Sequence, residues 1–326
     1  MIRLAGLFVR LLRYRVAAMI WLFLLLGAAH PDGFDAVSLP LALATVALAA
    51  SYVAATSVND LADEAIDRVN HPRDSGRPLL TGDADRRDLV RLHFLAWALA
   101  LVAAAPLGGR ALGLVALSLA IGVAYSVRPL ALSYRTWLAP LVLSLAYVGI
   151  PYALGAEASG RGWVTADATL LVALHLLFLA RIVLKDFRDR AGDARYGRPT
   201  LLLRFGKPAT CAVSLGCLAA GSFLLAAALG EFVLLPFVTA FALGIGGLLL
   251  RLSDAPEGRE EQVAIGLGAR LGNGLLVAVI AWLVLGGEGA PAGPRLLAVA
   301  LLTASFAGGV VALVRRPGEV VLGYKG

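Results

Sequence analysis

The hydrophobic pattern of the chain consists of long apolar runs separated by short polar segments. A helix that crosses a bilayer needs about 20 consecutive, predominantly apolar residues. Ten stretches meet or approach this length, at 14–30, 36–58, 88–107, 110–126, 136–154, 165–184, 208–229, 231–251, 263–285 and 294–314. The pattern therefore predicts an all-α fold, a polytopic transmembrane helical bundle.

The composition agrees with a membrane protein and disagrees with a soluble one. Of the 326 residues, 59% are hydrophobic and 16% are charged, whereas soluble domains average about 25% charged residues. The net charge of +7 does not indicate nucleic acid as a partner, because the cations gather at the ends of apolar runs, where they meet anionic lipid headgroups. Cys211 and Cys217 lie in one apolar stretch, which indicates neither a disulfide framework nor a metal site.

The basic residues predict the orientation in the membrane. If the N-terminus is cytoplasmic, the outer loops hold only Arg110, Arg161 and Arg295 of the 29 Lys and Arg residues. An even number of spans with both termini inside then satisfies the positive-inside rule. The basic stretch before residue 16 resembles a signal peptide, but no small-residue cleavage site with a soluble domain behind it follows, and we interpret 14–30 as a retained span. We expect a multi-pass protein of a bacterial plasma membrane, with both termini and the active-site loops in the cytoplasm.

Two acidic segments follow the second and sixth apolar runs, on the predicted cytoplasmic side. Asn59, Asp63 and Asp67 are four residues apart, and so are Asp189 and Asp193, so each set shares one face of a helix. Like charges at this spacing repel one another, and a multivalent cation bound between them would explain the arrangement. Mg²⁺ takes oxygen ligands and is often held by one or two carboxylates together with substrate phosphates. The alternative is that the carboxylates are solvated loop charges, but two segments with matching spacing on one side of the membrane favour a metal–diphosphate site.

Cations and one aromatic residue flank these segments. Arg73, Arg77, Arg181 and Lys185 are placed to reach the oxygens of a diphosphate, for which the planar guanidinium is well suited. Tyr125, at the inner end of the fourth run, is either a π face for a developing cation or an interfacial anchor.

These motifs resemble those of the UbiA superfamily of intramembrane prenyltransferases. The first segment reads Asn59-Asp60-x-x-Asp63-x-x-x-Asp67 and is followed by Gly76-Arg-Pro. The second reads Asp186-x-x-Asp189-x-x-x-Asp193 and is followed by Gly197-Arg-Pro, and Tyr125-Ser126 with Pro129 matches the Tyr-Ser-x-x-Pro segment of the superfamily. The resemblance covers about residues 10–285.

The resemblance implies a fold and a set of site residues. Residues 10–285 would form a nine-helix core with a central cavity that opens laterally to lipid, and 286–326 an appended tenth helix and tail, within a single integral membrane domain over 1–326. Lys185 and nearby arginines would bind diphosphate. After its Tyr-Ser-x-x-Pro segment the superfamily carries a basic residue, which leaves Arg128 or Arg135 to take that place here. The residues implied to hold Mg²⁺ and diphosphate are Asn59, Asp63, Asp67, Asp189 and Asp193, supported by Asp60 and Asp186. The expected catalytic residues are Asp63, Asp67, Asp189, Asp193 and Tyr125.

The predicted function is Mg²⁺-dependent transfer of a prenyl group from a polyprenyl diphosphate to an aromatic, quinone-precursor or related lipophilic acceptor. Membrane terpene cyclisation and phosphoribosyl transfer to a polyprenyl phosphate are alternatives, because the Asp segments would recognise the diphosphate and not the group attached to it. A cation transporter is disfavoured, since transport sites lie near the bilayer midplane and the carboxylates here lie at the inner ends of the runs. The prenyl length, the acceptor and the oligomeric state stay open at this point.

Overall fold

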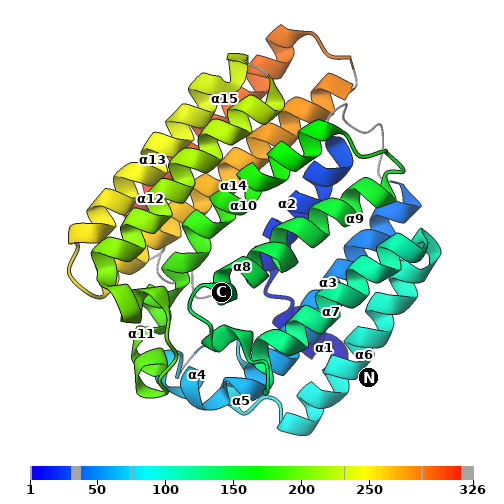
Figure 1. Ribbon diagram of the computed structural model, residues 1–326, viewed down its shortest axis with the longest axis vertical. Coiled ribbons are helices and arrows are strands. Elements are labelled where there is room, and N and C mark those ends of the chain that lie inside the picture. Colours follow the sequence, from blue (N-terminus) through cyan, green and yellow to red (C-terminus); the bar gives the residue numbers. More distant parts are fainter. Residues whose placement is uncertain are drawn as a thin grey trace.

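The computed structural model describes residues 2–30, 38–72, 74, 76–230, 232–287 and 289–316. Every regular element in these ranges is a helix, and the predicted fold class is confirmed (Figure 1). The elements in chain order are α1 (Ile2–Leu11), α2 (Tyr14–Ala29), α3 (Leu39–Ala62), α4 (Glu64–Asn70), α5 (Pro78–Thr81), α6 (Arg86–Ala104), η1 (Ala105–Leu107), α7 (Gly109–Ser126), η2 (Leu132–Tyr134), α8 (Leu138–Ser144), η3 (Leu145–Gly149), α9 (Ile150–Ala158), α10 (Thr165–Ile182), η4 (Val183–Lys185), α11 (Asp186–Arg195), α12 (Leu201–Leu229), η5 (Phe232–Leu234), α13 (Leu235–Asp254), α14 (Arg259–Gly287) and α15 (Ala292–Val314).

The helices fall where the apolar runs predict them, with one difference at the N-terminus. Within the described ranges, nine helices are long and apolar enough to cross a membrane, and ten if the bent pair α1–α2 counts as one span. The first predicted span, 14–30, is the 16-residue helix α2, and α1 meets it at 69°. The bend lies at Arg13, whose φ of 43° is left-handed. The predicted membrane orientation stays a prediction.

The bundle has two groups of helices that meet across α2 and α14 (Figure 1). In one group α3 packs against α6 and α7, and α2 packs against α9; in the other, α10, α12, α13, α14 and α15 follow one another as neighbours. The predicted tenth span is α15, which packs on α14 and buries few of its residues. Its separation from the core at residue 286 stays a prediction.

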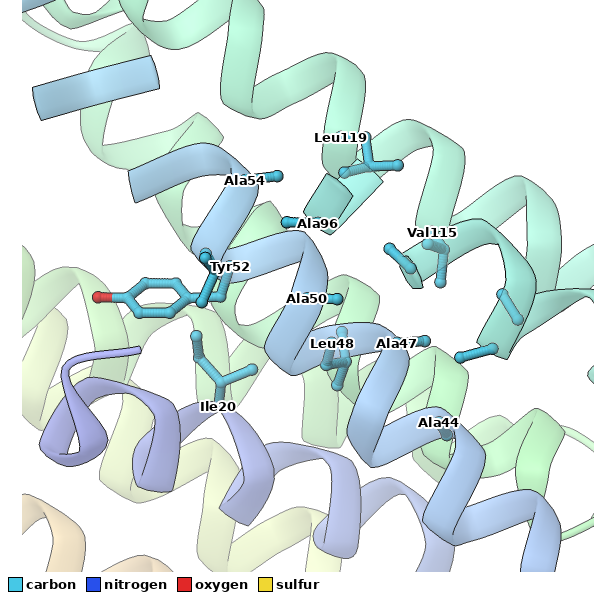
Figure 2. Close-up of a cluster of buried hydrophobic side chains, with 14 of the residues drawn as sticks. Ile20, Ala44, Ala47, Leu48, Ala50, Tyr52, Ala54, Ala96, Val115 and Leu119 are labelled. Carbon is cyan, nitrogen blue, oxygen red and sulfur yellow. The ribbon is translucent and has the colours of Figure 1, made fainter. Parts of the chain in front are cut away.

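Small residues let the helices of the first group approach closely. In α3, Ala47, Ala50 and Ala54 are fully buried among α6 and α7 residues such as Ala96 and Val115 (Figure 2). Lipid tails offer no hydrophobic force between helices, so close backbone packing of small residues is a main source of association. At Gly155 of α9, an added Cβ would lie 2.0 Å from the carbonyl oxygen of Leu24 in α2. The contact of α2 with the bundle therefore requires glycine there.

A buried ionic network joins α2, α9 and α10 at one end of the bundle. Arg161 donates to both oxygens of Asp167, at 2.8 and 2.9 Å, and to the carbonyl oxygen of Gly27 at 2.7 Å. His30 and Tyr152 also contact the Asp167 carboxylate. Hydrogen bonding to Asp167 raises the pKa of Arg161, although burial acts in the opposite direction. The network lies at the opposite end of α10 from α11 and ties three helices together.

Candidate functional site

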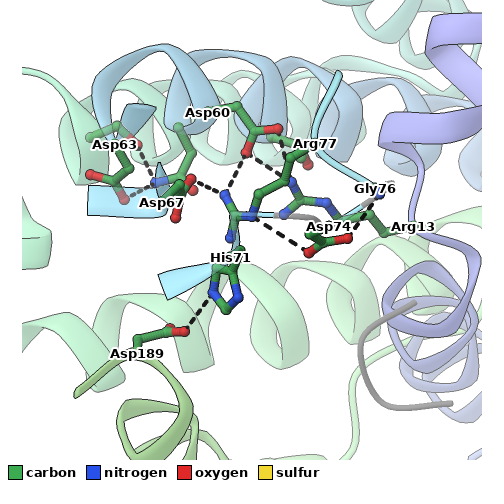
Figure 3. Close-up of polar contacts among 12 residues, drawn as sticks. Arg13, Asp60, Asp63, Asp67, His71, Asp74, Gly76, Arg77 and Asp189 are labelled. Atoms are coloured by element: carbon green, nitrogen blue, oxygen red, sulfur yellow. Dashed lines mark hydrogen bonds and ion pairs between the residues drawn. The ribbon is translucent and has the colours of Figure 1, made fainter. Parts of the chain in front are cut away.

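The two acidic segments lie together at one end of the bundle, where α4 and α11 pack against each other (Figure 1). The backbone N–H of Gly192 in α11 donates to Asn70 Oδ1 of α4 at 2.6 Å. His71 Nε2 lies 2.8 Å from Asp189 Oδ1, so a second contact joins the end of α4 to α11 (Figure 3). Residues more than 110 positions apart in the chain thus form one polar cluster, as the matching motifs predicted.

The first acidic segment keeps its carboxylates in a row although the helix changes at Asp63. Helix α3 ends at Ala62 and α4 begins at Glu64. The backbone N–H of Asp63 still donates to the Asn59 carbonyl, and that of Asp67 donates to the Asp63 carbonyl, both at 2.8 Å. The four-residue spacing is therefore preserved across the break. The side chain of Asn59 donates to Asp63 Oδ2 at 3.0 Å.

Arginines from outside α3 and α4 pair with this row (Figure 3). Arg13 donates to both oxygens of Asp60 at 2.8 Å, and Arg77 donates to Asp60 at 3.3 Å and forms a shorter contact with Asp67. Burial lowers the pKa of the Arg77 guanidinium, and the charge of Arg13 lowers it further, against the effect of Asp60. Arg77 is therefore a cation in an environment that disfavours its charge, which an additional anion would relieve.

The second row shares an arginine with the first. Arg198 donates to Asp63, and its Nη1 lies 3.5 Å from Asp193 Oδ1. Burial would lower the pKa of Arg198, but the charges of Asp63 and Asp193 outweigh it and raise that pKa. The Asp193 side chain is 0% exposed, and neither of its oxygens has a hydrogen-bond partner among the described residues. A buried carboxylate without hydrogen bonds is costly, so Asp193 is the group in this cluster that most needs a ligand.

A brace of charged residues holds α11 from its other side. Glu261, in the first turn of α14, is 2% exposed and accepts from Lys207 at 2.7 Å and from Arg190 of α11 at 3.3 Å. Within the second segment, Lys185 donates to Asp186 at 2.9 Å and Arg188 donates to Asp189 at 3.3 Å. The two contacts of Glu261 join α11 and α12 to α14.

A cavity of about 570 Å³ opens beside the two rows. The arrangement combines carboxylates and several cations at a polar end with an apolar wall that includes Met19, Phe178 and Tyr147. Such a cavity can hold an amphipathic molecule with a multiply charged anionic head. The predicted site residues that line it are Asn59, Asp63, Asp67, Arg77, Tyr125, Arg181, Lys185, Asp189 and Asp193.

Three predicted residues lie elsewhere, and one falls outside the described residues. Asp60 is buried behind the row, where it pairs with Arg13 and Arg77. Asp186 faces a small neighbouring pocket, and Arg128 is exposed in the segment after α7 and does not line the cavity. Arg73 lies outside the described residues. The roles predicted for these residues stay predictions.

The residues of the cluster that were not predicted from the sequence include Arg13, His71 and Arg198. A signal for Arg198 was present, because Gly197-Arg-Pro repeats the Gly76-Arg-Pro sequence that contains Arg77. His71 lies four residues after Asp67 and so continues the spacing of the first row, whereas Arg13 is recognised only from its contact across the bundle.

The donors of the cluster are compatible with Mg²⁺ bound together with a phosphate group. Among the described residues, no group of three or more His, Cys, Asp and Glu side chains is arranged to hold a metal ion by itself. This does not exclude Mg²⁺, which keeps waters and usually needs only one or two carboxylates plus substrate phosphates. Asp193, whose two oxygens lack hydrogen-bond partners, meets that requirement.

The fold and the cluster define a class: an integral membrane helical bundle with paired Asp segments at the polar end of an internal cavity. The chain belongs to the UbiA prenyltransferase family, whose profile matches residues 16–271. It is 29% identical over 173 residues to the bacteriochlorophyll synthase 33 kDa chain of Cereibacter sphaeroides, covering 51% of this chain and 55% of that one. It is 34% identical over 200 residues to the homogentisate phytyltransferase of Synechocystis sp., covering 56% and 60%. The matched region thus spans little more than half the length of these relatives.

The fold is similar to that of a solved family structure. A UbiA homolog from Archaeoglobus fulgidus bound to GPP and Mg²⁺ superposes with a TM-score of 0.69 at 18% identity, covering 85% of this chain and 99% of that chain. At this identity the likeness establishes the fold.

Proposed function

We propose that the chain is a Mg²⁺-dependent intramembrane prenyltransferase, which ionises a polyprenyl diphosphate and transfers the prenyl group to an aromatic, quinone-precursor or related lipophilic acceptor. The observation that carries the proposal is the pair of facing Asp rows, with the buried and unbonded Asp193 carboxylate, at the polar end of a cavity inside a membrane bundle. Family membership supports it, as do the transferase and synthase names of the relatives. The homolog from Archaeoglobus fulgidus was solved with GPP and Mg²⁺.

In this proposal Asn59, Asp63, Asp67, Asp189 and Asp193 hold Mg²⁺ against the diphosphate, and Asp60 and Asp186 support them. Bound there, Mg²⁺ would neutralise the negative charge that develops on the leaving diphosphate. In the structure, the paired carboxylates of the two rows contact basic side chains, such as Arg77 for Asp67.

Cations of the same cluster would bind the diphosphate oxygens. Arg77, Lys185 and Arg198 line the cavity beside the Asp rows, and charge-assisted hydrogen bonds to phosphate are strong and often bidentate for arginine. When the bond between C1 and oxygen breaks, its electron pair leaves with the diphosphate. These donors would stabilise the added charge on the leaving diphosphate.

Aromatic residues along the cavity would stabilise the prenyl cation. Tyr52, Tyr125, Tyr147 and Phe178 line the same cavity, and the rings of Tyr52 and Tyr147 lie 6.0 Å apart edge to face. The π face of an aromatic ring attracts a cation. The acceptor would then form the new bond to C1 and lose a proton, which completes the transfer.

The test uses purified protein in lipid nanodiscs with Mg²⁺, prenyl diphosphates of several lengths and a panel of acceptors, with products identified by mass spectrometry. Wild-type protein is expected to release diphosphate and form a prenylated acceptor. D193N is expected to lose at least about 100-fold in rate, because a misplaced or missing electrostatic group at such a site costs about 10²–10³. The matched control is D254N, at an exposed position at the end of α13, which should retain wild-type turnover.

Other outcomes separate the alternatives. Full activity of D193N, or wild-type turnover in excess EDTA, would refute the metal–diphosphate assignment. A hydrocarbon formed without acceptor would identify a cyclase. Turnover of phosphoribosyl diphosphate with inertness towards every prenyl diphosphate would identify phosphoribosyl transfer.

A further inference from the structure

A second polar cluster lies on a different wall of the cavity from the Asp rows, where α10 faces α14. Arg181 of α10 donates to Asn273 Oδ1 of α14 at 2.9 Å. Arg270 is three residues before Asn273, and all three side chains line the cavity. Residues three apart on a helix are neighbours on one face. This wall of the cavity therefore carries two guanidinium groups and an amide.

Arg270 has no acidic partner among the described residues, and its Nη1 is buried without a hydrogen bond there. It lies 11 residues after the first residue of α14, or about 16 Å along the helix at 1.5 Å per residue. An arginine inside a spanning segment is costly and marks a functional site by default. The other cavity-lining residues of α14, Gly266 and Ala269, are small and leave room beside Arg270.

The cations near the Asp rows differ in this respect. Arg77, Lys185, Arg188 and Arg198 all form described ion pairs with aspartates of the two segments. Their charges are therefore paired with the carboxylates at the proposed diphosphate end of the cavity. Arg181 lies one turn before Lys185 on the chain that runs from α10 into α11, about 6 Å further into the bundle, and it donates to Asn273 Oδ1 of α14.

We propose that Arg270, with Arg181 and Asn273, binds an anionic oxygen group, a carboxylate or a phosphate, on the acceptor. This inference rests on the proposed prenyl transfer and specifies its acceptor class: a molecule with a nucleophilic part and a separate anionic group held about one helical turn deeper than Lys185. Guanidinium groups recognise both anions through paired hydrogen bonds. A cyclisation reaction uses no acceptor, so it would bring no anionic group to the buried Arg270 charge.

The experiment compares wild type with R270M and R270K on acceptors that share one ring and differ in one substituent: carboxylate, its methyl ester, phosphate, or neutral hydroxyl only. R270M is expected to raise the KM for the anionic acceptors about 10-fold to 100-fold, the range expected from a hydrogen bond to a charged group. The KM for the neutral acceptors and the Kd for prenyl diphosphate should each change less than about twofold. R270K should recover part of the loss, since it keeps the charge without the planar fork. R251Q is the control, because Arg251 is largely exposed at the end of α13.

Three results would overturn the inference. R270M could weaken prenyl diphosphate binding instead, which would assign the cluster to the diphosphate. R270M could raise the KM for the carboxylate and for its methyl ester equally, which would show that the site does not recognise the anion. Wild type could also prefer the ester. The carboxylate and phosphate arms decide which anion the site takes.

Binding of the acceptors alone separates this inference from the proposed function. Thermal-shift titration of wild type and R270K with each compound requires no turnover. If the protein were inert to all prenyl diphosphates but bound the anionic compounds in an Arg270-dependent way, the transfer proposal would fail and the anion site would stand. Prenyl transfer with equal binding of acids and esters would support the proposed function and refute the anion site.

Discussion

Replacing Gly192 by alanine should separate the two Asp rows, because this glycine is where α4 and α11 touch. A Cβ at this position would lie 2.7 Å from the carbonyl oxygen of Ile66 and 2.6 Å from Asn70 Nδ2, where ordinary contact begins at 3.4 Å. The Asn70 side chain can rotate away at the cost of its hydrogen bond to the Gly192 N–H. The Ile66 carbonyl is backbone and cannot. The helices must therefore move apart by about 0.7 Å, the difference between those two distances.

That shift is small for the fold and large for the proposed chemistry. Overpacking of this kind costs about 1–3 kcal/mol of stability, so the variant should still fold. Mg²⁺ demands near-ideal geometry at about 2.0–2.1 Å, and a misplacement of about 1 Å can cost about 10²-fold in rate. We expect G192A to lose about 10-fold to 100-fold in Mg²⁺-dependent release of diphosphate from a prenyl diphosphate.

The matched control is G216A in α12, where an added Cβ meets nothing within 4 Å. It should leave both activity and the unfolding midpoint near those of wild type. G192A with wild-type turnover would refute the reasoning, because it would show that the two rows tolerate separation. Unfolding of G192A in detergent, measured without Mg²⁺, would show whether the variant folds. If it does not, N70A would test the same contact without a clash.

Two further predictions concern contacts outside the rows. E261Q removes the charge that braces Arg190 of α11 and should lower turnover severalfold, whereas E260Q, at a half-exposed neighbouring position, should not; equal rates in both would show that the brace does not position the second row. D167N removes the carboxylate that Arg161 contacts at the other end of the bundle and should lower the free energy of unfolding by about 3–5 kcal/mol. Turnover per folded molecule should be unchanged in D167N, and a stability equal to wild type in denaturant titration would contradict a structural role for this pair.

The spans and the Asp rows were predictable because both depend on local patterns. Apolar runs report helix length directly, and a four-residue spacing reports a helix face whatever lies opposite. The 14–30 run forms the helix α2, as predicted, and the unpredicted feature is the bend between α1 and α2 at Arg13. At the bend, Arg13 donates to Asp60, 47 residues away. No run of apolar residues carries that information.

The ion partners of the rows were only partly predictable, for the same physical reason. Arg77 was found because it lies near the first motif, and Arg198 was missed although the sequence around it repeats that of Arg77. His71 pairs with Asp189 across 118 residues, a contact that depends on how α4 and α11 pack. Arg270 is visible in the sequence as a charge in an apolar run, but its position on the cavity wall follows only from the rotation of α14 in the bundle.

The ion pairs of the two rows offset the repulsion between carboxylates that the sequence predicts. Carboxylates four residues apart destabilise a helix unless something neutralises them, and here Asp63, Asp67 and Asp189 pair with Arg198, Arg77 and His71. Each partner is also a donor suited to phosphate. In the proposed function, arrival of Mg²⁺ and diphosphate would let the carboxylates turn to the metal while Arg77 and Arg198 turn to the phosphate oxygens. These arginines and carboxylates would then change partner without leaving a charge unpaired in the bundle, where an isolated charge is most costly. Asp193, fully buried and without a hydrogen bond, is the one row carboxylate for which this exchange gains an interaction without giving up a hydrogen bond, which is why its substitution is the most direct test of the metal site.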